Sequence, residues 1–106
     1  MCDYDERWVY TEAFCDKTKK GKPLSLPDDL PHVIVTGEAM DADLTKTVPS
    51  ALAGSATGMG YGYDTITLLT LAQYIRNLGY RAYATMNDSA LAVPLAVQAG
   101  LGEVGR

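Results

Sequence analysis

The residues that could do chemistry in this sequence include a segment rich in glycine and small side chains, Gly54–Gly62, with the sequence GSATGMGYG. A segment of this kind can cradle a phosphate through its backbone N–H groups. It can also let a large planar ligand approach the backbone closely, because glycine has no Cβ. It contains neither G-x-G-x-x-G nor G-x-x-x-x-G-K-[ST], the two nucleotide-binding patterns. The spacing alone leaves both interpretations open.

The possible metal ligands and nucleophiles show no motif spacing. Asp41 and Asp43 are paired acids, but without further ligands nearby they are expected to cap a turn rather than bind a metal. His32 has no serine, cysteine or acid partner at a catalytic spacing, so a surface position is expected. Cys2 and Cys15 are too few for an iron–sulfur cluster, which takes about four thiolates. We therefore predict no metal site within this chain.

Composition excludes several classes of protein. The chain has 106 residues, enough for one domain, and 47% of them are hydrophobic. Its net charge of −4 argues against non-specific binding to nucleic acid, which needs a basic face. No run of about 18 apolar residues is present, and the charged start MCDYDERW lacks the apolar part of a signal peptide. A globular domain is expected.

A long helix must position the glycine-rich segment. We predict this helix over Asp64–Leu78, because its apolar residues recur at i, i+3, i+7 and i+10: Leu68, Leu71, Ile75 and Leu78. Asp64 is a plausible N-cap, since its carboxylate can accept from the free N–H groups of the first turn. Gly79 follows the last apolar position, where a left-handed residue commonly closes a helix.

Two strands and a second helix are expected around it. The run Val33–Glu38 predicts a strand covered on both faces. Tyr80–Thr85 alternates like a short strand, which we expect over Arg81–Thr85 and parallel to the first. Asn87, Asp88 and Ser89 supply turn chemistry before a helix. That helix should run to about Ala99, with Pro94 in its first turn and Gly100 closing it.

These elements define an α/β fold class in which helices pack on a small sheet. Residues 1–32 should form an N-terminal arm and a connector that is interrupted by Pro23, Pro27 and Pro31. The arm could hold a short helix or run extended, and Lys17–Lys22 is expected to be a solvated loop. The final stretch, Gly100–Arg106, looks like the start of a loop. We therefore expect this chain to be part of a longer protein.

Several strings of residues resemble one known family. They are VIVTGEAMD, VPSA, LAQYIRNLGYRA and MNDSALAVPLAVQAGLGEVGR. Together they are similar to the corrinoid-binding core of the reductive dehalogenases, the cobamide and iron–sulfur enzymes of organohalide respiration. The similarity covers about Val33–Arg106. It implies that residues 33–106 are an incomplete, nitroreductase-like, corrinoid-binding catalytic domain.

The resemblance implies an activity and its partners. The full-length enzyme would replace halogen by hydrogen on an organohalide, using a cobamide and two [4Fe-4S] clusters whose cysteines lie after the part matched here. A membrane anchor protein and a position on the outer (periplasmic) face of the cell membrane are also implied. The sequence identifies neither the electron donor nor the organohalide. This chain alone is expected to be inactive.

The resemblance also suggests roles for individual residues. Tyr61 would be the proton donor, with Tyr63, two residues on, as a competing choice. Asn87 would hold the tyrosine or the substrate by hydrogen bonding. The residues expected to contact the cofactor are Gly58, Gly60, Met86 and Ser89.

Two alternatives remain open. The epoxyqueuosine reductases are also cobamide and iron–sulfur proteins with an acid-rich loop before an AGLG turn, and in them an aspartate at the place of Asp88 would donate the proton. This sequence departs from their pattern, since GLGEVGR stands where they carry a tryptophan and a lysine. The other alternative is a non-catalytic cobamide-binding module.

Overall fold

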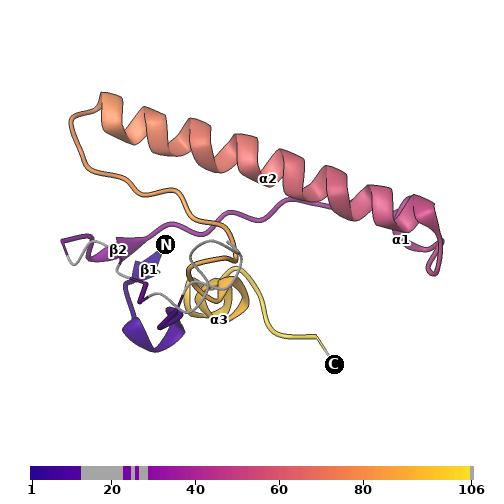
Figure 1. The fold of residues 1–106 in the computed structure, drawn as a ribbon, viewed down its shortest axis with the longest axis horizontal. Coiled ribbons are helices and arrows are strands. Elements are labelled where there is room, and N and C mark those ends of the chain that lie inside the picture. Colours follow the sequence, from indigo (N-terminus) through magenta and orange to yellow (C-terminus); the bar gives the residue numbers. More distant parts are fainter. Residues whose placement is uncertain (13–22, 25, 27–28, 106) are drawn as a thin grey trace.

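The helix α2, Ala51–Asn77, is the element to which the rest of the chain attaches (Figure 1). The computed structural model describes residues 1–12, 23–24, 26 and 29–105. The other elements, in chain order, are β1 (Cys2–Asp3), the 3-10 helix η1 (Glu6–Trp8), β2 (His32–Val33), α1 (Ala42–Thr45) and α3 (Ala92–Gln98). Cys15, Pro27 and the basic run Lys17–Lys22 lie outside the described residues.

The start of α2 differs from the prediction. The helix begins after Ser50, whose hydroxyl accepts from the backbone N–H of Ala53 at 3.3 Å, so Asp64 is not its N-cap. The glycine-rich segment is therefore helical. Each glycine inside a helix costs about 1 kcal/mol relative to alanine. This part of α2 packs against α1 and the segment before it, which offsets that cost: Ala56 is buried, and Met40 lies against Gly60.

The end of α2 agrees with the prediction. Leu78 is the C-cap, and Gly79 has φ +94°, the left-handed conformation expected of a closing glycine. Leu68, Leu71 and Ile75 are half-buried on one stripe, as their spacing predicts. Leu78, the last residue of the predicted stripe, is 57% exposed.

The sheet is smaller than predicted, and its two strands are antiparallel, whereas the predicted strands were parallel. β1 and β2 pair antiparallel, with Cys2 opposite Val33 and Asp3 opposite His32. The strand predicted over Val33–Glu38 is therefore present only at its first residue, and Arg81–Thr85 is not a strand. Residues 34–40 instead run along α2, where the hydroxyl of Thr67 donates to a carboxylate oxygen of Glu38 at 2.7 Å. That route places the segment against a helix, which offers no backbone partners for a sheet.

The turns around the short helices match the sequence. Asp41 caps α1, because its carboxylate accepts from the N–H groups of Asp43 and Leu44, each at 3.0 Å. Residues 87–89 form a turn before α3. Pro94 is in the first turn of that helix, and Gly100, with φ +76°, follows its C-cap. Local side-chain chemistry is enough to predict each of these features.

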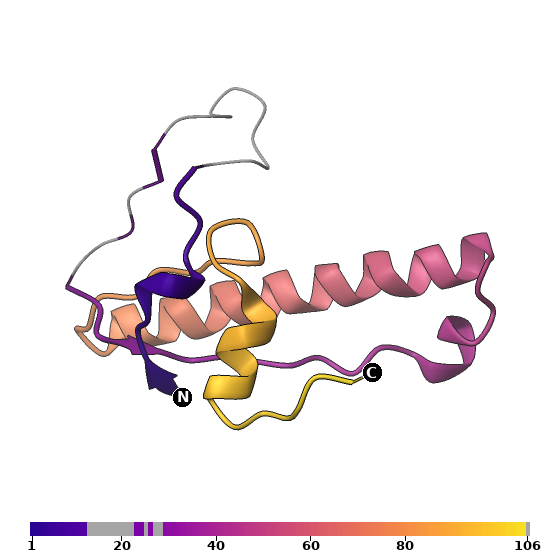
Figure 2. The ribbon, with the colours of Figure 1, turned by 90° about the horizontal axis from the view of Figure 1, so that it is seen from below.

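The N-terminal arm packs on the start of α3 (Figure 2). The backbone N–H of Leu91 donates to the carbonyl of Trp8 at 2.7 Å, and that of Tyr10 donates to the carbonyl of Ser89 at 3.0 Å. The Trp8 indole N–H also meets the amide oxygen of Gln98 at 3.2 Å. The arm therefore holds the turn before α3 in place. Whether residues 1–32 form a separate unit stays a prediction.

Candidate functional site

Asn87 lies in the turn before α3 and uses one end of its amide there. Its Oδ1 accepts from the backbone N–H of Ala92, the first residue of α3, at 3.1 Å. Within the same turn the hydroxyl of Thr85 donates to Asp88 Oδ1 at 3.0 Å. Ser89 is 5% exposed. The turn is therefore tied down on both sides, while the side chains of Asn87 and Asp88 remain accessible.

Tyr61 lies on the face of α2 that the Asn87 turn approaches. Residues 61, 65, 68, 72 and 75 follow one another at intervals of four and three, so they form one stripe of the helix. The hydroxyl of Thr65 lies 2.7 Å from the carbonyl oxygen of Tyr61 and 3.1 Å from the sulfur of Met86. Met86 precedes Asn87 directly. The fold thus brings Met86, the residue before the turn, to within one helical turn of Tyr61, a residue that is 58% exposed.

Tyr63 lies on a different face of α2. Two residues along a helix correspond to a rotation of about 200°. Tyr63 lines a small hollow together with Met40, Asp41 and Ala56. Although its side chain is also more than half exposed, the hollow is formed by the segment before α1 and not by the Asn87 turn. The geometry therefore separates two tyrosines that the sequence could not tell apart.

The glycines of α2 also divide between two faces. Gly54, Gly58 and Gly62 recur at every fourth position, and a Cβ at any of them would meet nothing within 4 Å. Their backbone N–H groups lie inside a helix, where they bond to carbonyls four residues earlier, so they are not free to cradle a phosphate, the first of the two interpretations left open by the sequence. The open face fits the other interpretation, close approach of a large planar ligand. Gly60 points away from this face, toward Met40.

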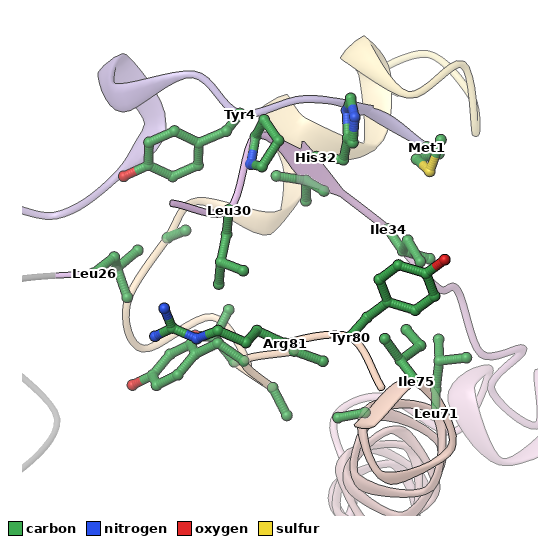
Figure 3. A pocket seen from close by; sticks show the side chains of 18 of the residues that line it. Met1, Tyr4, Leu26, Leu30, His32, Ile34, Leu71, Ile75, Tyr80 and Arg81 are labelled. Carbon is green, nitrogen blue, oxygen red and sulfur yellow. The ribbon is translucent and has the colours of Figure 1, made fainter. Parts of the chain in front are cut away.

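A cavity of about 690 Å³ lies beside these residues but does not include the predicted site (Figure 3). One wall is the stripe of α2 that contains Leu71 and Ile75, and Leu30 and Ile34 come from the opposite side. The cavity reaches the Asn87 turn only at its flanking residues, Thr85 and Ala90. The apolar stripe of α2 predicts one wall of this cavity from the sequence. The residues that face the stripe come from remote segments, so the sequence does not predict them.

The charges at the cavity are paired. Arg81, which lines it, forms an ion pair with Asp29. Asp5 also lines it, and a hydrogen bond from the Arg7 guanidinium, with a second from the Arg7 backbone N–H, lowers the pKa of the Asp5 carboxyl. In the described part of the chain, no three His, Cys, Asp or Glu side chains gather where they could hold a metal ion. The cavity is therefore lined mainly by apolar side chains, and Arg81 and Asp5 at its wall each pair with a side chain of opposite charge.

Comparison with known proteins decides the family. A family model described as a reductive dehalogenase subunit matches residues 9–106. The chain belongs to the reductive dehalogenase family. The match also begins earlier than the stretch that resembled this family in the sequence, Val33–Arg106. It therefore includes part of the N-terminal arm.

Curated reductive dehalogenases align with this chain along much of its length. A tetrachloroethene reductive dehalogenase of Desulfitobacterium hafniense is 31% identical over 141 aligned residues, and one of Dehalobacter restrictus is 32% identical. Both alignments cover the whole chain and 25% of the relative. A tetrachloroethene reductive dehalogenase of Sulfurospirillum multivorans is 35% identical over 83 residues, or 78% of this chain. The chain thus spans about a quarter of the length of the first two.

No solved structure matches this chain. Among the residues that the structure describes, no helix is long and apolar enough to cross a membrane.

Proposed function

We propose that this chain is the part of a corrinoid-dependent reductive dehalogenase that supplies the proton donor, Tyr61, and its neighbour Asn87. The overall reaction replaces halogen by hydrogen on an organohalide. The observation that carries the proposal is the contact of Thr65 with Met86, because it brings the Asn87 turn onto the Tyr61 face of α2. Membership of the dehalogenase family supports the reaction class.

The proposed role of the protein is to deliver a proton at a defined place. Replacing a carbon–halogen bond by carbon–hydrogen consumes two electrons and one proton and releases halide. A bound corrinoid supplies the electrons. A tyrosine phenol carries its proton at neutral pH and can donate it to the carbon that loses halide. The exposed position of Tyr61 leaves its hydroxyl accessible to a substrate.

The open face of α2 is the proposed place for the corrinoid. Gly58 has no Cβ and no neighbour within 4 Å of where one would be, so a planar group can lie close to the helix there. Tyr61 and Met86 border this face. Gly60 faces Met40 and Ser89 is buried within the turn, so neither is part of the proposed binding surface.

The wider setting of the enzyme follows the family resemblance and belongs to the proposal. Two [4Fe-4S] clusters need about eight thiolates, and this sequence contains only Cys2 and Cys15, so we assign the cluster ligands to sequence outside these 106 residues. We propose a role in organohalide respiration at the outer face of the cell membrane, with a membrane anchor protein as partner. A nitroreductase-like core is the proposed fold of the complete catalytic domain.

The test is Tyr61→Phe in the corrinoid-loaded holoenzyme, assayed with tetrachloroethene, the substrate in the names of the relatives. The change removes one hydroxyl. We expect turnover to fall at least about 100-fold, the usual contribution of a general acid, with unchanged corrinoid and iron content. Tyr63→Phe is the matched control and should keep near-normal turnover.

Three outcomes would contradict this assignment. Normal turnover of Tyr61→Phe with an inactive Tyr63→Phe would move the proton donor to the other face of α2. Activity of both variants with loss in Asp88→Asn would favour a mechanism like that of the epoxyqueuosine reductases. Loss of corrinoid from Tyr61→Phe would show that the hydroxyl serves binding instead of proton transfer.

A further inference from the structure

Residues 81–86 connect α2 to the Asn87 turn without forming a helix or a strand. They run back alongside α2, from its C-terminal end to the level of Thr65 (Figure 1). A strand in a sheet is positioned by a ladder of backbone hydrogen bonds. This segment has no such ladder, so separate contacts must set its path and thereby the position of Asn87.

Arg76 makes one of these contacts from the last turn of α2. Its Nε and Nη2 both donate to the carbonyl oxygen of Ala82, at 3.0 Å and 2.7 Å. Gly79, in the left-handed conformation, reverses the chain between these two residues. Two donors of one rigid guanidinium on a single acceptor constrain both its distance and its direction. The contact therefore fixes where the returning segment begins its path along the helix.

The second contact lies at the far end of the segment, between Thr65 and Met86. The segment is thus tied to α2 at Ala82 and at Met86, and Asn87 follows immediately. Arg81, by contrast, points to the opposite side, where it pairs with Asp29 at the surface. An exposed ion pair of this kind contributes little to the position of a backbone.

We propose that Arg76 is a positioning residue of the dehalogenase site: by holding the carbonyl of Ala82 it sets where Asn87 lies relative to Tyr61. This inference rests on the proposed function, since it gives Arg76 its effect through Asn87. Arg76 itself touches neither residue in any contact of the structure. A misplacement of about 1 Å can cost about 100-fold in rate, so a contact on the connecting segment can control turnover.

A double-mutant cycle in the holoenzyme tests this role. Arg76→Ala should lower kcat at least about 10-fold with unchanged corrinoid content. Arg76→Lys keeps the charge and can donate from one nitrogen in place of two, so it should lose less. In an Asn87→Ala background, Arg76→Ala should cause no further loss, because the group it positions is gone. Arg81→Ala is the matched control. Arg81 is an exposed arginine next to Ala82 in the sequence, and its removal should leave kcat unchanged.

Other outcomes overturn the inference. If the kcat losses of Arg76→Ala and Asn87→Ala multiply, Arg76 does not act through Asn87, and the proposed function still stands. If Tyr61→Phe and Asn87→Ala both keep full turnover, the proposed function fails and the role of Arg76 fails with it. Should Arg76→Ala not accumulate as holoenzyme, Arg76→Lys decides the question: its smaller loss must vanish in the Asn87→Ala background.

Discussion

Asn87 has one amide, and the structure shows which end of it is in use. The oxygen accepts from the N–H of Ala92, an N–H that begins α3 and that its N-cap residue, Leu91, cannot bond through a side chain. The NH₂ group is then the part of Asn87 that can meet Tyr61 or a substrate, and it can only donate. In the proposed site Asn87 therefore has two roles: its oxygen accepts from the first N–H of α3, and its NH₂ group presents a donor.

This double role predicts different results for two substitutions. Asn87→Asp keeps an oxygen for Ala92 and loses the donor, so turnover should fall while thermal stability stays near that of the parent. Asn87→Ala loses both and should also lower stability by about 1 kcal/mol, as for a lost cap. Thermal unfolding and steady-state kinetics of the two holoenzymes measure this. Equal destabilisation by both changes would contradict the capping role.

At the scale of elements, α2 has two faces with different surroundings. One face carries Ala56, Gly60 and Tyr63 and packs near the segment before α1. The other carries Tyr61 and the open glycines, of which Gly58 is central. Glycine in a helix costs stability, and no neighbouring atom requires it on the open face. Close approach of a ligand is the physical reason we propose for keeping it.

Gly58→Ala separates folding from binding. Without a ligand, the added methyl group meets nothing within 4 Å, so α2 should become more stable by about 0.5–1 kcal/mol. With corrinoid the same methyl should obstruct the approach, and corrinoid content should fall. Gly60→Ala is the control on the other face, where the methyl would lie 3.4 Å from Met40 Cγ, and it should keep its corrinoid. Full loading of Gly58→Ala would rule out the open face as the binding surface.

At the scale of the whole molecule, little apolar surface is buried. Among the described residues the buried hydrophobic side chains are Ala56, Ala72, Ala90 and Leu95, and three of these are alanines. Large residues such as Ile66, Leu69 and Val93 are more than half exposed. Burial of apolar area is the main favourable term in folding. The described residues therefore have little from which to derive a cooperative stability of their own.

We expect the isolated 106-residue chain to behave accordingly. It should bind the dye ANS, which reports accessible apolar surface, and should unfold over a broad temperature range without a sharp transition. Dye fluorescence and calorimetry on the purified chain measure both properties. A single sharp calorimetric transition with no dye binding would show that the chain packs a sufficient core.

The sequence by itself determined the features that depend on neighbouring residues. Gly79 and Gly100 close helices and Asn87–Ser89 forms a turn, because each conformation follows from side-chain chemistry within a few positions. The family could also be recognised from short strings of residues, because comparing such strings does not require knowledge of the fold.

Only the tertiary structure decided which residues come together. Ser50 is a local N-cap for α2, but the glycines that follow it disfavour a helix, which packing on α1 then supports. The strand expected at Arg81–Thr85 is absent because the segment returns along a helix, where Arg76 holds it, instead of beside another strand. Tyr61 and Tyr63 differ for the same reason: the segment that meets each face comes from a distant part of the chain, and periodicity within one helix does not record it.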